Sequence, residues 1–249
     1  MNFQYLQKIL HKFPGLINLL VKPFALDSAS SSKKEGSMKH EEFGDLVSKL
    51  IDWQGHIPDA ADRLLAKICR MHSAPAQATN LNGGDLFYMP TQIRQIEEPI
   101  NAGLLNKNDF FVDVGCGPGA RLPVYVQLRT GAHTAGIEKY KLYYEHAAET
   151  VRDLSLENKV EVFHCDALDY DYTIGNVFFM FQPVEGEKLD LLLDKIACQR
   201  RNTETLILAK GKIEQSLHKS SNYSWLRSFK VGGVQAFKTS GSSPSYFIP

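Results

Sequence analysis

Three glycines, each separated from the next by one residue, form the most informative segment of the chain. Gly115, Gly117 and Gly119 lie in VDVGCGPGA, directly after a β-prone run and before a helical pattern. Glycines allow a tight turn whose backbone can approach a ligand closely, and the helix start beyond it presents free N–H groups. We therefore expect a cofactor of the nucleotide type at this turn.

A carboxylate follows at the spacing that such a cofactor requires. Glu138 is the last residue of the run HTAGIE and lies 19 positions after Gly119 (138 minus 119). A carboxylate at the end of a second strand can accept hydrogen bonds from both hydroxyls of a ribose. Each signal alone is weak, but their combination at this spacing predicts a nucleotide site.

Two later strand ends bring polar residues to the same edge. The run KVEVFH is followed by Asp166 and Ala167, and the run NVFFMF is followed by Gln182 and Pro183. The first pair would lie at the rim of an adenine pocket. The second would lie at the carboxyl end of the sheet, where ligands of open parallel sheets bind.

Alternating strands and helices are expected to position these residues. Short apolar runs typical of strands buried on both faces alternate with helical patterns, which predicts an α/β fold with a doubly wound, mostly parallel sheet. Near the end, RSFKVGGVQAFKT predicts an antiparallel hairpin that completes seven strands. The expected parallel strands are 109–114, 133–138, 159–164, 176–181 and 205–210, and the helices between them are 119–129, 141–153 and 186–201.

A helical extension precedes the sheet. Helices are expected at 58–72, which has acidic residues near its start and basic residues near its end, and at 90–103, where Pro99 should introduce a kink. Residues 27–40, DSASSSKKEGSMKH, have little to bury and predict a flexible linker. We therefore divide the chain into an arm and linker at 1–40, a helical extension at 41–84 and the main domain at 85–249.

The first 26 residues contain three lysines and no acid, with apolar residues spaced for one face of a helix. Three interpretations remain open. The arm could pack on its own domain or on a second subunit, it could lie on a membrane surface or direct the chain to an organelle, or it could be a secretory signal. No stretch reaches the ~20 apolar residues of a membrane-spanning helix.

Composition excludes several classes of protein. Lys+Arg 28 balance Asp+Glu 28, which argues against binding of nucleic acid by bulk charge. The four cysteines are far apart and form no C-x-x-C pair, so neither a zinc site nor a disulfide scaffold is indicated and no metal is expected. A reducing, cytoplasmic compartment is the default expectation. The oligomeric state stays open.

A nicotinamide dinucleotide is the first cofactor to weigh, because Gly115, Gly117 and Ala120 also satisfy G-x-G-x-x-A. Only 134 residues follow Gly115 (249 minus 115), too few for a nucleotide domain and a separate substrate domain. The polar residues after the third and fourth strands also oppose this assignment, as does a closing antiparallel hairpin.

Residues 85–249 resemble the class I methyltransferases that use S-adenosylmethionine. VDVGCGPGA is similar to the first motif of that family, AGIEK to its acidic strand end, HCDA to its adenine motif and MFQPV to the motif beside the methyl group. The resemblance implies a class I methyltransferase domain with S-adenosylmethionine as its cofactor. It implies that the methionine end is held by Asp113, Gly115, Cys116, Gly117, Pro118 and Gly119, the ribose by Glu138 with Lys139 beside it, and the adenine by Asp166 and Ala167, with Gln182 and Pro183 facing the methyl.

The stretch DLFYMPTQI resembles the segment that closes over the cofactor in lysine methyltransferases lacking a SET domain. It contains Tyr88, Pro90 and Thr91. The N-P-P-Y type signature of some amino-group methyltransferases is not present, because Gln182 and Pro183 are followed by valine. This departure leaves the methyl acceptor open.

Local charge provides the last indication of the acceptor. Residues 161–195 contain eight acidic residues and two lysines, whereas residues 205–249 contain six basic residues and one acid. An acidic rim near the methyl attracts a cationic substrate. We therefore predict a lysine on a protein partner. An RNA or small-molecule acceptor is the alternative, and a catalytically inactive cofactor-binding regulator is the non-enzymatic alternative.

Overall fold

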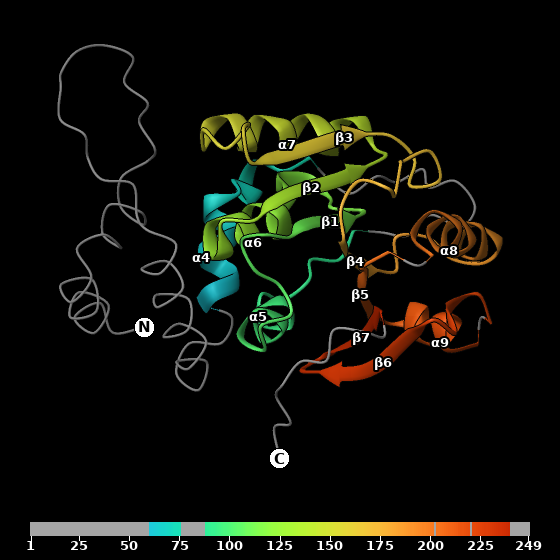
Figure 1. Ribbon diagram of the computed structural model, residues 1–249. Helices are drawn as coiled ribbons and strands as arrows, with labels where there is room; N and C mark the ends of the chain where they lie inside the picture. Colours follow the sequence, from blue (N-terminus) through green and yellow to red (C-terminus); the bar gives the residue numbers. More distant parts are fainter. Residues whose placement is uncertain (1–59, 76–87, 202, 220, 240–249) are drawn as a thin grey trace, which may run out of the picture.

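A seven-stranded sheet forms the centre of the computed structural model, which describes residues 60–75, 88–201, 203–219 and 221–239 (Figure 1). Its strand order is β3-β2-β1-β4-β5-β7-β6. The first five strands pair in parallel, and β7 pairs antiparallel with both β5 and β6. The strands are β1 (Phe110–Val114), β2 (His133–Glu138), β3 (Val160–His164), β4 (Val177–Phe181), β5 (Leu206–Lys210), β6 (Leu226–Val231) and β7 (Val234–Thr239).

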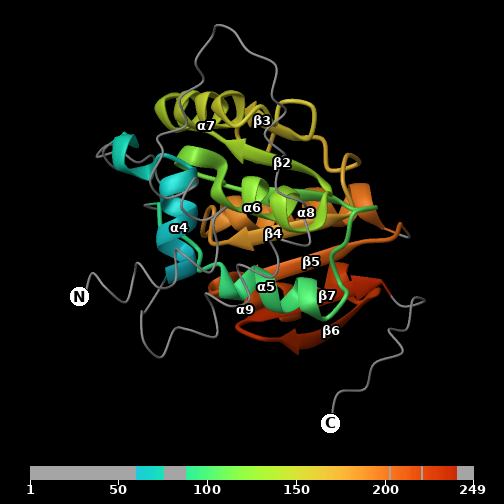
Figure 2. The same ribbon diagram turned by 90° about the vertical axis from the view of Figure 1, so that its left-hand side faces the viewer.

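Helices cover both faces of the sheet. Helices α4 to α7 pack with Phe111 and Phe179 on one face, whereas α8 and α9 pack with Val112 and Phe178 on the other. Figure 2 shows α4, α5 and α6 in front of the strands. This two-sided cover explains why the strands are almost entirely apolar. The helices are α4 (Ala60–Ile68), α5 (Arg94–Asn101), α6 (Arg121–Thr130), α7 (Lys141–Asp153), α8 (Glu187–Arg200) and α9 (Lys212–Lys219).

Parallel pairing places the ends of four neighbouring strands at one edge. Val114 of β1 is in register with Ile137 of β2 and with Met180 of β4, and Glu138 is in register with His164 of β3. The segments that follow β1, β2, β3 and β4 therefore begin side by side. Glu138 ends β2, and Gly115, Asp166 and Gln182 follow the ends of β1, β3 and β4, so these residues selected from the sequence lie along one edge.

Helix α4 packs against the same core as the sheet. Leu64, Leu65 and Ile68 are each at most 5% exposed and belong to the cluster that contains Phe111. Just beyond the helix, Arg70 forms ion pairs with Glu149 and Asp153 of α7. The helix is therefore fixed to the body of the molecule by apolar and ionic contacts.

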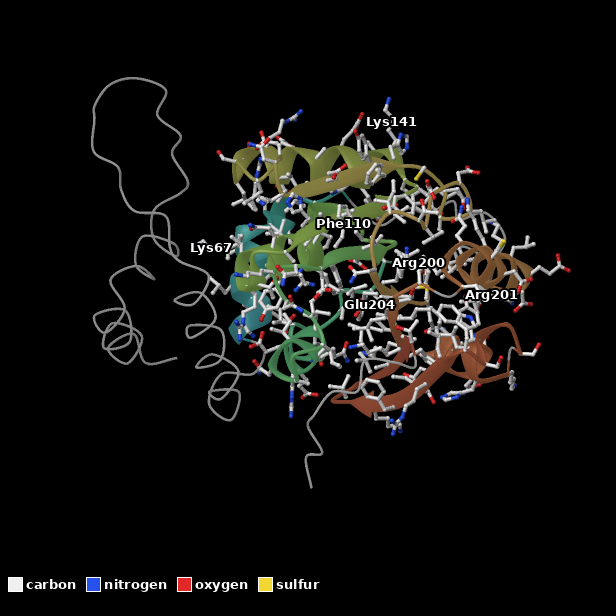
Figure 3. All side chains as sticks on the ribbon, in the orientation of Figure 1. Lys67, Phe110, Lys141, Arg200, Arg201 and Glu204 are labelled. Atoms are coloured by element: carbon white, nitrogen blue, oxygen red, sulfur yellow. The ribbon has the colours of Figure 1, made fainter. Side chains whose placement is uncertain are left out.

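The amino-terminal edge of the sheet is closed by a buried arginine. Arg200, labelled in Figure 3, ends α8 and donates to the Thr205 hydroxyl at 3.1 Å and to the Glu204 carbonyl at 2.6 Å. Its guanidinium also lies 5.8 Å from the centre of the Phe178 ring. These contacts satisfy hydrogen-bond donors of the Arg200 guanidinium, a charged group in a residue that is only 7% exposed. Arg200 thus serves the fold, far from the strand ends described above.

The predicted fold is confirmed, including the parallel strands and the closing hairpin around Gly232. Helix α7 has the predicted bounds, whereas the helix expected at 90–103 is shorter and begins at Arg94. The Ile93 amide donates to Asp62 of α4 at 3.1 Å instead of continuing the helix backwards. Helix α9 was not predicted because only Ile213 and Leu217 form its buried stripe.

Residues 1–59 and 76–87 lie outside the described part of the chain, so the arm, the linker and the boundary near residue 84 stay predictions. Among the helices that the structure describes, none has the length and apolar character needed to cross a membrane.

Candidate functional site

The glycine turn after β1 is anchored to the neighbouring strand. The amides of Gly115 and Cys116 both donate to the Ile137 carbonyl, at 3.0 and 2.9 Å. Gly117 then adopts a φ of 66°, which side-chain-bearing residues rarely adopt. A short 3-10 helix, Pro118–Ala120, leads into α6. The turn predicted from the sequence is therefore present, with backbone conformations that require glycine.

Glu138 is bound to this turn. Its Oε2 accepts a hydrogen bond from the Gly117 amide at 2.9 Å, and its Oε1 accepts one from the Tyr140 amide at 2.8 Å. Burial raises the pKa of Glu138, and these backbone N–H groups oppose the rise. A carboxylate has about four acceptor positions. Glu138 therefore holds the turn and keeps acceptor capacity for a ligand.

Asp113, near the end of β1, is buried beside two charged groups. It is 6% exposed. Burial raises its pKa to about 8, with a further contribution from Glu138, while Arg121 acts in the opposite direction. The side chain of Cys116 packs against β2, because its Sγ lies 2.6 Å from a β-carbon built on Gly136. Burial also raises the pKa of this thiol, which makes it a packing residue rather than a nucleophile.

Arg121 is a site residue that the sequence analysis did not select. It opens α6, is 6% exposed, and its Nη2 donates to Asp62 Oδ1 at 3.1 Å. It also hydrogen-bonds to the Tyr88 hydroxyl. A sequence signal was available, because cations are disfavoured at the positive N-terminal end of a helix and Arg121 directly follows the glycine turn.

The segment before α5 covers the glycine turn. A β-carbon built on Gly117 would lie 2.2 Å from Cε2 of Tyr88, so the tyrosine ring occupies the space that the missing side chain leaves. The same ring meets Tyr143 of α7 edge to face, with 6.1 Å between centres. Burial raises the pKa of Tyr88 to about 12, so its hydroxyl stays protonated at neutral pH. Thr91 is buried, and Pro90 is exposed.

The third strand end contains an ion pair. Lys139 Nζ lies 3.1 Å from Asp166 Oδ2. Burial alone would raise the pKa of Asp166, but the Leu168 amide and Lys139 hydrogen-bond to the carboxylate and bring the pKa below its usual value. The Ala167 carbonyl accepts a hydrogen bond from the Tyr172 hydroxyl at 3.0 Å. Lys139, Asp166 and Ala167 thus form a polar cluster beside Glu138.

The fourth strand end turns sharply. Gln182 has a φ of 47°, and its Oε1 lies 2.7 Å from a β-carbon built on Gly211 at the end of β5. Pro183 packs on the glycine turn, with its Cβ 3.1 Å from a β-carbon built on Gly115. Gln182 therefore lies against the β5 end, and Pro183 closes one side of the turn.

Some of these residues line a common recess. Among the predicted site residues, its lining includes Tyr88, Thr91, Asp113, Gly115 and Cys116, whereas Glu138, Asp166 and Gln182 lie outside it. The other lining residues were not predicted as site residues, and Arg121, Phe179 and Phe181 are among them. Within the described residues, no group of histidine, cysteine, aspartate and glutamate side chains could hold a metal ion.

Comparisons with known proteins give short or distant similarities. No protein-family model matches the chain. A histone-lysine N-methyltransferase specific for H3 lysine-79, from Dictyostelium discoideum, is 30% identical over 105 residues, which cover 37% of this chain and 6% of that protein. The chain therefore corresponds to a small part of this curated relative.

Two solved structures of methyltransferases are also distantly similar to this chain. An RNA methyltransferase from Salinibacter ruber, in complex with S-adenosyl-L-homocysteine, has a TM-score of 0.48 at 16% identity and covers 65% of this chain and 100% of that chain. A SAM-dependent methyltransferase from Aquifex aeolicus has a TM-score of 0.44 at 20% identity and covers 58% and 88%. The sheet order and its terminal hairpin are those of the class I methyltransferase fold expected from the sequence.

Proposed function

We propose that this protein is an S-adenosylmethionine-dependent methyltransferase that acts on a lysine of a protein partner. The observation that carries the proposal is the contact between Glu138 and the glycine turn. It places a buried carboxylate with spare acceptor positions beside a backbone turn at the carboxyl edge of a parallel sheet. An adenosine-type cofactor fits these donors and acceptors.

Each proposed role follows the position of a residue along that edge. Asp113 and the turn at 115–119 would hold the amino-acid end of the cofactor, and Glu138 its ribose. Asp166 and Ala167, with Lys139 paired to the aspartate, would border the adenine. Tyr88, Pro90 and Thr91 would cover the cofactor, because Tyr88 already lies over Gly117. Gln182 and Pro183 would lie nearest to the transferred methyl.

When bound, the cofactor supplies a methyl group on a positively charged sulfur that is already activated for transfer. The residues of this chain then have to align the acceptor and exclude water. Phe179 and Phe181 provide apolar walls in the recess. A lysine amine, with a free pKa of ~10.4, has to be neutral to attack, and an apolar wall lowers its pKa by disfavouring the charged form.

The protein-lysine acceptor is supported by the charge of the loops that flank the site. Asp169, Glu187 and Asp190 are exposed on the segments that follow β3 and β4, at the same edge as the glycine turn. A cationic side chain is attracted to such a rim, and a phosphate is repelled. The 30% identity to a histone-lysine methyltransferase over a limited segment agrees with this choice.

An RNA acceptor is the second candidate, because Arg227 and Lys230 are exposed on β6. That strand is at the outer edge of the sheet and is separated from β4 by β5 and β7. Neighbouring strands are about 4.8 Å apart, so this basic strand lies well away from the end of β4. Its position favours the protein acceptor for the site itself.

A cytoplasmic location, or a peripheral membrane contact through residues 1–26, belongs to the same proposal.

The acceptor is tested by incubating the full chain with methyl-labelled cofactor and fractionated lysate. We expect label in protein, recovered as methyl-lysine after hydrolysis and assigned to a site by tryptic mapping. Activity should fall as salt increases, because exposed charges are screened within about 10 Å at 0.1 M salt. Label that is sensitive to nuclease, without methyl-lysine, would select RNA. Cofactor binding without transfer to any fraction would select the inactive regulator.

A further inference from the structure

The search for a function beyond the residues assigned above leads to the guanidinium of Arg121. Its side chain is 7% exposed, and its Nη2 is paired with Asp62. Its Nε is buried and has no hydrogen-bond partner. Arg121 also lines the recess that contains Asp113 and Thr91. A buried N–H that finds no partner within the protein is costly, so the unsatisfied Nε at a recess indicates a ligand.

A purely structural role does not account for this arginine. It begins α6, where the helix dipole disfavours a cation. The ion pair with Asp62 and the hydrogen bond to the Tyr88 hydroxyl use part of the guanidinium and leave Nε unsatisfied. A guanidinium carries five N–H donors in a planar fork, an arrangement suited to carboxylates. The missing partner is therefore expected to be an anion with planar acceptor geometry.

A carboxyl group is present in the same recess as the guanidinium. Asp113 lines it together with Arg121, and the two interact electrostatically. A cationic donor and a carboxyl group that share one small recess are complementary to an α-amino acid, which carries a carboxylate and an ammonium on one carbon. The recess also borders Gly115 of the glycine turn.

We propose that Arg121 binds the α-carboxylate of the cofactor's amino-acid end, while Asp113 accepts hydrogen bonds from its α-ammonium. This inference rests on the proposed function, since it assigns one end of the same cofactor. Asp62 is a positioning residue. Its Oδ1 accepts from Arg121 at 3.1 Å and from the Ile93 amide at 3.1 Å, so it fixes the guanidinium and the segment leading into α5 together.

The proposal gives helix α4 a part in cofactor binding. Asp62 lies on α4, whose apolar residues are packed into the core, so the position of Arg121 depends on a helix almost 60 residues before it in sequence. A ligand without the carboxylate would leave Arg121 Nε unsatisfied. The chain should therefore discriminate strongly against cofactor analogues that lack only this group.

Calorimetric titration of the full chain with two ligands tests the inference. The ligands are S-adenosylhomocysteine and its decarboxylated analogue, which keeps the amine. We expect the unaltered protein to bind the first roughly 10- to 100-fold more tightly, as one or two charge-assisted hydrogen bonds imply. Arg121→Gln should reduce that preference to less than about threefold by removing the guanidinium. Arg129→Gln, on the same helix but paired with Glu97, should keep it.

The outcomes separate this inference from the proposed function. Equal affinity of the unaltered protein for the two ligands overturns the inference without using any variant, so a misfolded variant cannot obscure the result. An unchanged preference in a folded Arg121→Gln also overturns it, while the proposed function stands. If neither ligand binds the unaltered protein, the proposed function itself fails. Asp62→Asn, which keeps the arginine, should lower the preference partially, as a positioning role requires.

Discussion

The Gly117 amide donates a 2.9 Å hydrogen bond to Oε2 of Glu138, joining the turn after β1 to the end of β2. The contact links the two features that the sequence placed 21 residues apart. Because the carboxylate is buried, it acts both as a structural acceptor for the turn and as a proposed acceptor for the cofactor ribose. The two roles can be measured separately.

Glu138→Ala should weaken binding of S-adenosylhomocysteine and also destabilise the free protein. Loss of one or two charge-assisted bonds to the ligand is worth roughly 1.5 to 3 kcal/mol each. The Gly117 and Tyr140 amides lose their acceptor in the same variant. Glu138→Gln keeps an acceptor oxygen and should recover part of the ligand affinity and part of the stability of the free protein. Calorimetry and thermal unfolding measure them separately, and full affinity in the alanine variant would remove Glu138 from the site.

Asp113→Asn should change how stability depends on pH. In the folded protein, burial raises the pKa of Asp113 from 3.8 to about 8. Its protonated form therefore stabilises the fold at low pH, and this contribution is lost as pH rises between these values, by at most about 1.4 kcal/mol per unit. The asparagine variant lacks this loss, so its stability relative to the wild type should increase from pH 6 to pH 8.

Urea unfolding at the two pH values measures the Asp113 effect, because contributions of the other titrating groups largely cancel in the difference between the proteins. A difference that is independent of pH would show that Asp113 is ionised in the free protein. In the presence of the cofactor, the same variant should bind more weakly, because the proposed ammonium partner is lost.

Gln182→Ala should reduce turnover far more than cofactor affinity. Gln182 follows β4 at the strand end proposed to face the methyl, and its side chain packs on Gly211 rather than lining the recess. Groups that act mainly in the transition state lower kcat without a matching change in ground-state binding. Methyl transfer and calorimetry distinguish the two effects, with wild-type turnover as the result that excludes a catalytic role.

Gly117→Ala should destabilise the protein through a direct clash. The added β-carbon would lie 2.2 Å from the Tyr88 ring, in a backbone conformation with a φ of 66°. The clash should be relieved by Tyr88→Ala in the double variant, leaving a cost of roughly 1 to 3 kcal/mol for a backbone conformation that only glycine adopts readily. Unfolding free energies of the four proteins give this coupling. Strictly additive effects would show that the two residues do not touch.

The sequence predicts the sheet well because its strands are marked by apolar runs and its site by residues at strand ends. Glu138 and Asp166 could be found in this way, since the register of parallel strands places such residues at one edge. Asp62 could not be found in this way, because its contact with Arg121 joins residues that are 59 positions apart on different helices. Arg121 was indicated only by its position directly after the glycine turn. The sequence analysis expected the Gln182 side chain to face the methyl. Its contact with Gly211 depends on the conformation of the turn after β4, which the sequence pattern does not predict.

Thermal unfolding of the full chain with S-adenosylhomocysteine, compared with NAD, tests the central claim most directly. A ligand at 100 times its Kd stabilises the folded state by about 2.7 kcal/mol, which shifts the melting temperature measurably. We expect a clear, concentration-dependent increase with S-adenosylhomocysteine and none with NAD. An increase with NAD alone would contradict the assignment of this site to a methyltransferase cofactor.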